Sequence, residues 1–154
     1  MKICIDCDDA AVNLKAIIYE HVKSKNIEIT DLAFSDTKEN AMYPEIAFNL
    51  AKKIQSGEYE RGICICGTGL GVAMMINKVE GVFAGTCHDV FSAERLCKSN
   101  DAQVITMGER VIGPELAKTI IDAWLNSTFA GGGSIPKVEQ MRELEKLSFK
   151  TSSI

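Results

Sequence analysis

The sequence Gly62-Ile63-Cys64-Ile65-Cys66-Gly67-Thr68-Gly69-Leu70-Gly71 joins a short apolar run to a glycine-rich loop. A continuous apolar run of this length is typical of a strand in a parallel sheet whose two faces are both covered by helices. The loop leads into a helical pattern, and the thiol of Cys66 then lies at the carboxyl end of the strand. Strand, glycine turn and helix in this order predict one β-α unit of an α/β fold.

Similar units flank this stretch on both sides. Apolar runs predict further strands at residues 3–5, 27–34, 82–86 and 103–107, and a polar loop is expected at 35–42. Amphipathic patterns predict helices at residues 14–22, 43–54, 91–98 and 116–125. We therefore expect a three-layer α/β/α Rossmann-like sandwich with a five-stranded parallel sheet, with functional side chains at the carboxyl ends of its strands.

The pattern changes after Phe129, and we expect residues 1–154 to form a single domain whose segment 129–154 has a separate role. Residues 131–134 are Gly-Gly-Gly-Ser and predict a flexible hinge. Residues 138, 141, 144 and 147 are Val, Met, Leu and Leu, a narrow apolar stripe on a last helix. Such a stripe after a hinge predicts a helix that packs across a dimer.

Composition excludes several classes of protein. The chain has 154 residues, 17 Lys plus Arg against 21 Asp plus Glu and a net charge of −4, which argues against binding to nucleic acid. The most apolar stretch, residues 63–76, is interrupted by glycines and falls short of the roughly 20 residues of a spanning helix. With an acidic residue already at position 6, no signal peptide is expected, so we predict a cytoplasmic protein with six reduced cysteines.

The loop after Cys66 is the strongest local signal for chemistry. Its glycines let backbone N–H groups converge near a helix start, which favours an anion, an oxyanion or a thiolate. Val72 stands where a dinucleotide fingerprint would need its third glycine, and no Lys-Ser/Thr pair follows as in a P-loop. Cys66 is therefore a candidate base. The alternative is a buried cysteine that merely packs beside a tight turn.

Two acidic motifs follow other strands at the same predicted edge. Asp8 and Asp9 place adjacent carboxylates there, suited to bind a polyol or to act as acid and base, unless they only cap a helix. His88 and Asp89 follow the fourth strand and form either an oriented acid–base pair or a loop that leads into a helix.

The order of motifs along nearly the whole chain resembles one family, ribose-5-phosphate isomerase B and the galactose-6-phosphate isomerase subunits. The motifs that carry the resemblance are Cys7-Asp8, Met42-Tyr43-Pro44, Cys66-Gly67-Thr68-Gly69-Leu70-Gly71, Asn77-Lys78-Val79-Glu80-Gly81, Cys87-His88-Asp89, Ser99-Asn100-Asp101-Ala102 and Met107-Gly108-Glu109-Arg110.

The resemblance implies an aldose–ketose isomerase of sugar phosphates that works through an enediolate without a cofactor or a metal. Cys66 would be the base, Thr68 would position the intermediate, and Asp8, Tyr43 and Asn100 would contact sugar hydroxyls. It also implies a homodimer or tetramer with sites between subunits, across which Arg110 and the C-terminal segment reach. Backbone N–H groups would hold the enediolate oxygen at Gly67, Gly69, Leu70 and Gly71.

The sequence departs from the family pattern where substrate would bind. Asp9 and Ser99 replace histidines, the second of which opens the sugar ring, while Gly133 and Lys137 replace phosphate-binding arginines. These changes make the site less positive, which disfavours ribose 5-phosphate in the family's usual pose. We expect another small sugar phosphate that meets Lys137 and Arg110, or a short one that cannot cyclise, such as a tetrose 4-phosphate. The alternatives are one subunit of a hetero-oligomeric isomerase and a non-catalytic sugar-phosphate binding protein.

Overall fold

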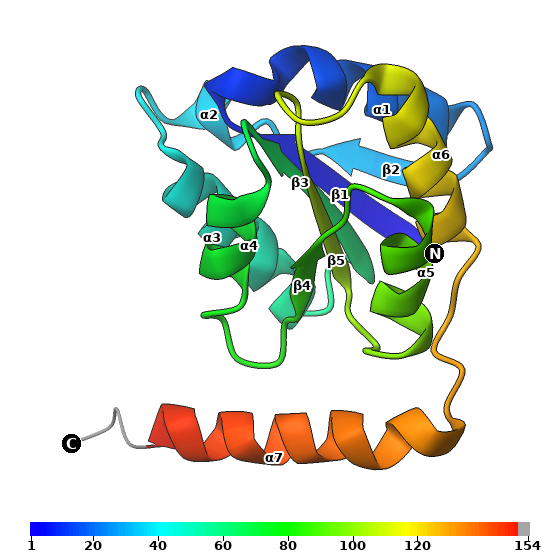
Figure 1. The fold of residues 1–154 in the computed structure, drawn as a ribbon. Helices are drawn as coiled ribbons and strands as arrows, with labels where there is room; N and C mark the ends of the chain where they lie inside the picture. Colours follow the sequence, from blue (N-terminus) through cyan, green and yellow to red (C-terminus); the bar gives the residue numbers. More distant parts are fainter. Residues whose placement is uncertain (151–154) are drawn as a thin grey trace.

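The computed structural model describes residues 1–150, and a parallel five-stranded sheet lies at its centre (Figure 1). The strands follow the order β2-β1-β3-β5-β4. In chain order they are β1 (Lys2–Cys7), β2 (Glu28–Asp31), β3 (Arg61–Cys66), β4 (Ala84–Thr86) and β5 (Val104–Gly108). β3 occupies the middle and pairs with β1 and β5, so the glycine loop after Cys66 leaves the centre of the sheet.

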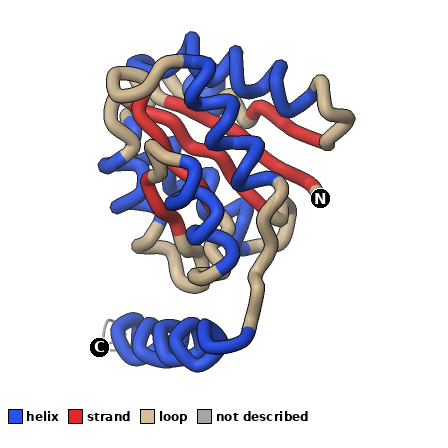
Figure 2. Tube along the Cα trace, turned by 45° about the vertical axis from the view of Figure 1, so that its right-hand side comes forward, coloured by secondary structure: helices blue, strands red, loops and turns tan. Residues whose placement is uncertain are grey.

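Helices cover both faces of the sheet, as Figure 2 shows from a second side. One face carries α1 (Val12–Lys23), α5 (Val90–Lys98) and α6 (Pro114–Leu125), which pack on Ile63, Ile65 and other residues of the sheet. The opposite face carries α3 (Tyr43–Gln55) and α4 (Leu70–Ile76), which pack on the alternate positions Cys64 and Cys66. The predicted three-layer α/β/α sandwich is confirmed, and the alternation of strand side chains explains why β3 is apolar throughout.

The second strand is shorter than predicted. We expected it to run to Phe34, but β2 ends at Asp31. The short helix α2 (Phe34–Thr37) begins at the last residue of the expected strand and extends into the segment 35–42 that was expected to be a loop. Side chains impose the turn, because Asp31 Oδ1 accepts the N–H of Ala33 at 3.0 Å and Asp6 Oδ2 accepts that of Phe34 at 3.2 Å. Ala33 itself takes a left-handed conformation, with φ of 46°. The chain is thus turned toward the carboxyl end of β1.

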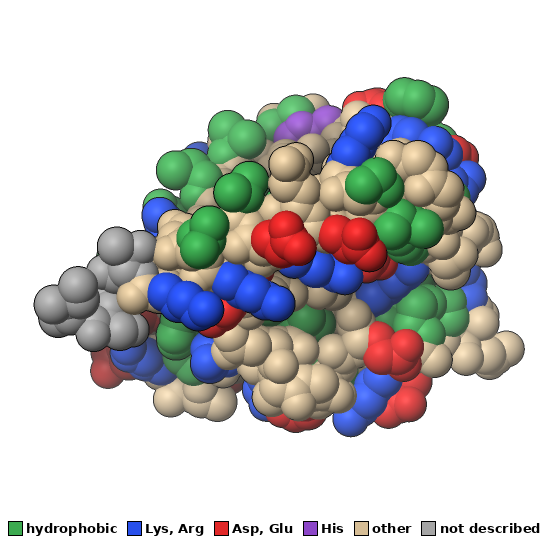
Figure 3. All heavy atoms as spheres, turned by 90° about the horizontal axis from the view of Figure 1, so that it is seen from below, with side chains coloured by type: hydrophobic (Ala, Val, Ile, Leu, Met, Phe, Trp, Pro, Cys, Tyr) green, Lys and Arg blue, Asp and Glu red, His purple; other side chains and the backbone are tan. Residues whose placement is uncertain are grey.

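After α6 the chain runs past the sheet to a separate long helix, α7 (Ile135–Lys150). The predicted glycine hinge is partly ordered, since Gly132–Ser134 form a single 3-10 turn, η2. α7 lies at the amino ends of the strands, and Figure 3 shows hydrophobic, acidic and basic side chains interspersed over this end of the molecule. Within residues 1–150 no helix combines the length and the apolar character needed to span a membrane.

α7 is attached to the core by few polar contacts. Arg142 Nη2 lies 2.5 Å from Asp101 Oδ2, and Glu145 Oε1 accepts the N–H of Gly81 at 3.0 Å. Of the predicted apolar stripe only Val138 is buried, while Leu144 stays 59% exposed. The packing of this helix across a dimer remains a prediction, and residues 151–154 of the expected C-terminal segment lie outside the described residues.

Candidate active site

The loop after β3 is pressed against the end of β5. A Cβ atom on Gly69 would lie 2.8 Å from the Cα of Met107, and one on Gly108 would lie 2.6 Å from the Cα of Thr68. Gly69 also has φ of +79°, a conformation that side-chain-bearing residues rarely adopt. The two glycines are therefore required by close backbone approach, and the loop is held in one place on the sheet edge.

Cys66 lies at the base of this loop and is 5% exposed. Its Sγ accepts the N–H of Gly69 at 3.1 Å, a contact that stabilises the negative charge of a thiolate. Thr68 Oγ1 accepts the N–H of Leu70 at 3.3 Å, at the first turn of α4. The geometry suits a thiol that exchanges a proton with a molecule bound above the loop.

A cavity of about 430 Å³ opens above Cys66 and brings many of the predicted site residues together. Tyr43 closes one side by packing on the loop, since a Cβ on Gly71 would lie 2.7 Å from its ring. The residues that line the cavity are Asp8, Asp9, Ala10, Tyr43, Cys66, Gly67, Thr68, Gly71 and Arg110. Elements from the ends of β1, β3 and β5 and from the start of α3 thus meet at one edge, as expected for a parallel sheet.

Arg110 lies over the glycine loop of its own chain. A Cβ on Gly67 would be 3.4 Å from Arg110 Nη1, and the N–H of Arg110 donates to the carbonyl of Gly67 at 3.1 Å. Glu109 fixes the same turn, because its Oε2 accepts the N–H of Leu14 at 2.9 Å. Within one chain the Arg110 guanidinium thus lines the cavity as a positive group, and its reach across to a partner subunit stays a prediction.

Asp8 caps a helical turn and also lines the cavity, so its predicted role as a cap is confirmed and its role in binding stays a prediction. Its Oδ1 accepts the N–H of Ala10 at 3.1 Å and caps the 3-10 turn η1 (Asp9–Ala11), and the same residue lines the cavity. Burial raises the pKa of the Asp8 carboxyl and Asp9 adds to the rise, while the Ala10 N–H and Arg110 oppose it. Asp8 can thus exchange hydrogen bonds with a hydroxyl at the cavity wall, next to the exposed carboxylate of Asp9.

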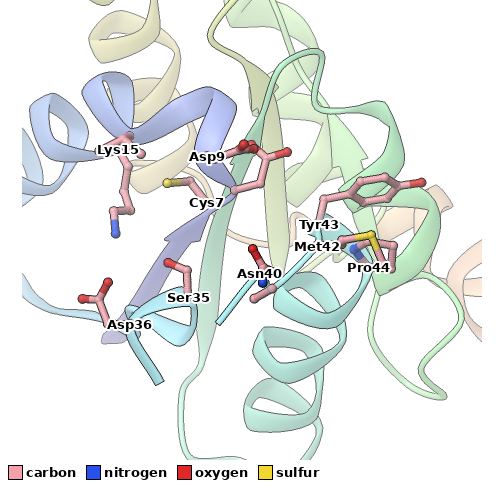
Figure 4. Close-up of a pocket in the computed structure, with 12 residues that line it drawn as sticks. Cys7, Asp9, Lys15, Ser35, Asp36, Asn40, Met42, Tyr43 and Pro44 are labelled. Carbon is pink, nitrogen blue, oxygen red and sulfur yellow. The ribbon is translucent and has the colours of Figure 1, made fainter. Parts of the chain in front are cut away.

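A second, larger cavity of about 650 Å³ shares Asp8, Asp9 and Tyr43 with the first (Figure 4). Ser35 of α2 and Asn40 supply further polar groups to its wall. Sequence reasoning missed both because they lie in the segment expected to be only a polar loop. Their signal was the polar run itself, next to the Met42-Tyr43-Pro44 motif.

Three predicted site residues lie far from Cys66 within one chain. Ser99 and Asn100 follow α5, where their N–H groups donate to the carbonyl of Arg95 at 2.9 and 3.3 Å. α5 starts after the carboxyl end of β4 and ends before the amino end of β5, so both residues lie at the opposite edge of the sheet. Lys137 lies on α7 at the same opposite end. A single chain does not bring these three residues to the cavity.

His88 and Asp89 do not form an oriented acid–base pair. Asp89 caps α5 by accepting the N–H and the hydroxyl of Ser92, each at 2.7 Å. His88 Nε2 instead accepts the N–H of Gly108 at 2.9 Å and so holds the end of β5 beneath the glycine loop. Burial lowers the pKa of His88, with partial opposition from Asp89.

This contact predicts a pH-dependent loss of stability. Because the folded state lowers the pKa of His88, the unfolded chain takes up the proton first as the pH falls through about 6.5, and the free energy of unfolding declines. His88→Gln, whose amide oxygen accepts the same N–H, lacks this titration. We expect the stability of the wild type relative to His88→Gln to fall between pH 7.5 and 5.5 in urea unfolding. A constant difference would contradict the assignment.

Three comparisons with known proteins place this chain in a family. The family model described as ribose/galactose isomerase matches residues 3–141. The chain belongs to this family. It is 50% identical to a D-erythrulose-4-phosphate isomerase of Pectobacterium atrosepticum over 92% of this chain and 93% of that protein. It is 47% identical to a ribose-5-P isomerase B of Listeria innocua over 95% of this chain and 98% of that protein.

The fold agrees with solved members of the family. A ribose-5-phosphate isomerase B of Clostridium thermocellum superposes with a TM-score of 0.90 and 38% identity, over 96% of this chain and 99% of that chain. This member of the ribose/galactose isomerase family is thus an aldose–ketose isomerase of sugar phosphates, as the resemblance implied.

Proposed function

We propose that this isomerase interconverts a four-carbon aldose phosphate and the matching ketose phosphate, with Cys66 as the base. The observation that carries the proposal is the Cys66 thiol, which accepts the Gly69 N–H and lines the floor of a cavity whose wall is made of hydroxyl-binding groups. The substrate length is supported by the residue at position 99 and by the 50% identical erythrulose-phosphate relative.

The chemistry follows from the placement of these groups. The Cys66 thiolate removes a proton from the carbon next to the carbonyl, and the electron pair moves onto the carbonyl oxygen to give an enediolate. Backbone N–H groups of the glycine loop other than that of Gly69, which faces Cys66, stabilise that oxygen. Loss of one such donor costs about 2.7–4 kcal/mol in comparable oxyanion sites. The thiol then returns the proton to the neighbouring carbon, while a hydroxyl proton moves between the two oxygens. In this proposal Thr68 and Asp8, which line the cavity, orient those oxygens.

A four-carbon substrate removes the need for a ring-opening acid. An aldopentose 5-phosphate closes its ring through the hydroxyl on C4, and an enzyme that uses it must open the ring first. In an aldotetrose 4-phosphate this oxygen carries the phosphate, so the sugar cannot form the five-membered ring. Ser99, which is not an acid, stands where the family carries its ring-opening histidine. The sequence at this position therefore fits a substrate that is always open.

The charged residues of the cavity indicate where the phosphate of the substrate binds. Asp8 and Asp9 face a single guanidinium, that of Arg110, and a phosphate dianion close to Asp9 would be repelled. We propose that the phosphate lies on the Arg110 side and that Lys137 of a second subunit completes its binding site. Ser35 and Asn40 border the adjoining cavity, where they are placed to meet sugar hydroxyls.

The function is tested with a panel of four- to six-carbon sugar phosphates in deuterated water. We expect deuterium at C1 or C2 and net isomerisation. We also expect kcat/KM to be at least about 100-fold higher for erythrulose 4-phosphate than for ribose 5-phosphate, a ratio typical of a site that lacks contacts needed by the second substrate. Faster turnover of ribose 5-phosphate would contradict the proposed substrate. Exchange only with an added homologous chain would favour a hetero-oligomer, and binding without exchange would favour a sugar-phosphate binding protein.

We also propose that the working enzyme is at least a homodimer. In one chain Asn100 and Lys137 lie at the opposite end of the sheet from Cys66, so a second copy is needed to bring them to the cavity. The side chains of Met141 and Leu144 on α7 are 36% and 59% exposed and supply an apolar surface for that contact.

A further inference from the structure

Two threonine hydroxyls lie together beneath the glycine loop. Thr86 of β4 and Thr106 of β5 are paired across the sheet, and their Oγ1 atoms are 2.9 Å apart. Thr106 is completely buried. Both hydroxyls reach the same acceptor, the carbonyl oxygen of Gly69, at 3.0 Å from Thr86 and 2.9 Å from Thr106.

The number of hydroxyl protons limits how the hydrogen bonds of this cluster can be arranged. Two hydroxyls supply two protons, and the cluster has three short oxygen–oxygen contacts. Either both hydroxyls donate to Gly69, or one donates to the other and the second donates to Gly69. In every arrangement at least one threonine donates to the Gly69 carbonyl. Since the N–H of Ala73 also donates to it, at 3.3 Å, this carbonyl is held from the strands and from α4.

The other polar group of Gly69 points at the proposed base. Its N–H donates to Cys66 Sγ at 3.1 Å, and its φ of 79° and ψ of −12° together set the angle between the held carbonyl and that N–H. A glycine has wide rotational freedom, so the direction of its N–H depends on what anchors it. The hydroxyls of Thr86 and Thr106 provide that anchor, from two strands far away in the sequence.

We propose that Thr86 and Thr106 are positioning residues that hold Gly69 so that its N–H stabilises the Cys66 thiolate. Neither threonine lines the cavity above Cys66, so they act through Gly69 and not on the substrate. The inference rests on the proposed function only in taking Cys66 as the base. The inference assigns a role to Thr86 and Thr106, which lie outside the Cys66–Gly71 motif.

The test measures the reactivity of Cys66 without any substrate. Iodoacetamide labelling of the wild type, Thr106→Val and Thr86→Val is followed by mass spectrometry across pH 6–10; valine keeps the shape of threonine and removes the hydroxyl. We expect labelling of Cys66 at pH 7 to slow about three-fold in each single variant and about ten-fold in the double variant Thr86→Val/Thr106→Val, because a lost thiolate hydrogen bond disfavours the charged form. Labelling should recover at high pH in all three variants. Thr106→Ser, which restores the hydroxyl, should return the wild-type profile.

A matched control variant and kinetic measurements distinguish the proposed positioning role of Thr86 and Thr106 from a merely structural role. Thr119→Val removes a hydroxyl that donates to Glu115 on α6, far from the loop, and should leave the labelling profile unchanged. In folded threonine variants kcat should fall about ten-fold with little change in KM. If the buried Thr106→Val does not fold, Thr86→Val alone still decides the outcome, because Thr86 is only partly buried.

A wild-type labelling profile in folded Thr86→Val and Thr106→Val would overturn the inference. The result is independent of the substrate, since labelling reports on the thiol itself. If no sugar phosphate is turned over but the profile still moves to higher pH, the proposed function fails and the positioning role stands.

Discussion

Replacement of Cys66 by alanine is expected to lower kcat about 1,000-fold, because it removes the only group that we assign to take the carbon-bound proton. The enediolate-stabilising N–H groups and the cavity remain, so substrate should still bind with a similar KM. Deuterium incorporation at C1 and C2, followed by NMR in deuterated water, separates loss of proton transfer from loss of binding. Exchange at the wild-type rate in Cys66→Ala would show that another group is the base.

Cys64 provides a matched control for this variant. It lies two residues earlier on β3, is fully buried on the same face of the sheet and does not line the cavity. Cys64→Ala should cost stability, since it leaves a small void in the core, but should keep kcat within about two- to three-fold of the wild type. Equal losses in both variants would point to damage of the fold and not to lost chemistry.

Mixing two inactive variants is expected to restore activity if the site is shared between subunits. One chain carries Cys66→Ala, and the other carries Asn100→Ala with Lys137→Ala, so a mixed dimer contains one intact site. Random exchange of subunits in a symmetric dimer should recover about a quarter of the wild-type activity. Each variant alone should stay at about 1% or less, because it lacks either the base or two substrate contacts.

The outcome is checked by unfolding and refolding the two chains together and separately. Size-exclusion chromatography before and after refolding shows whether dimers have reformed. As a control, a chain that carries only Lys118→Ala, on the solvent side of α6, is used in place of the Asn100→Ala/Lys137→Ala chain. This control chain should be active both alone and when mixed with Cys66→Ala. Dimers that contain both chains but show no gain in activity would contradict a site built from Cys66 of one subunit and Asn100 of the other.

The sequence predicted most of the fold because its signals are local. The apolar run at 62–66 and the helical stripes repeat over short distances, so they identify β3, α3 and α6 without knowledge of distant contacts. The boundary that failed, at Phe34, depends on Asp6, whose carboxylate accepts the Phe34 N–H across 28 positions of the chain. No local pattern contains that contact.

For the site, too, the local features were predicted from the sequence and the contacts between distant residues were not. Cys66 and its glycine loop are contiguous, and the sequence by itself determined that a thiol would lie beside a glycine turn at the carboxyl end of a strand. Only the tertiary structure decided that Arg110 lies over its own chain's Gly67 and that His88 holds Gly108.

Distance along the chain also hid from the sequence analysis the placement of residues that we propose to act in the site. Thr86 and Thr106 meet at Gly69, and Asn100 lies at the other end of the sheet from Cys66. The periodicity of apolar residues reports which face of an element is buried, because burial is the main driving force and repeats with the backbone. Directional hydrogen bonds between residues remote in sequence leave no such repeat, so the fold has to be built before they can be seen.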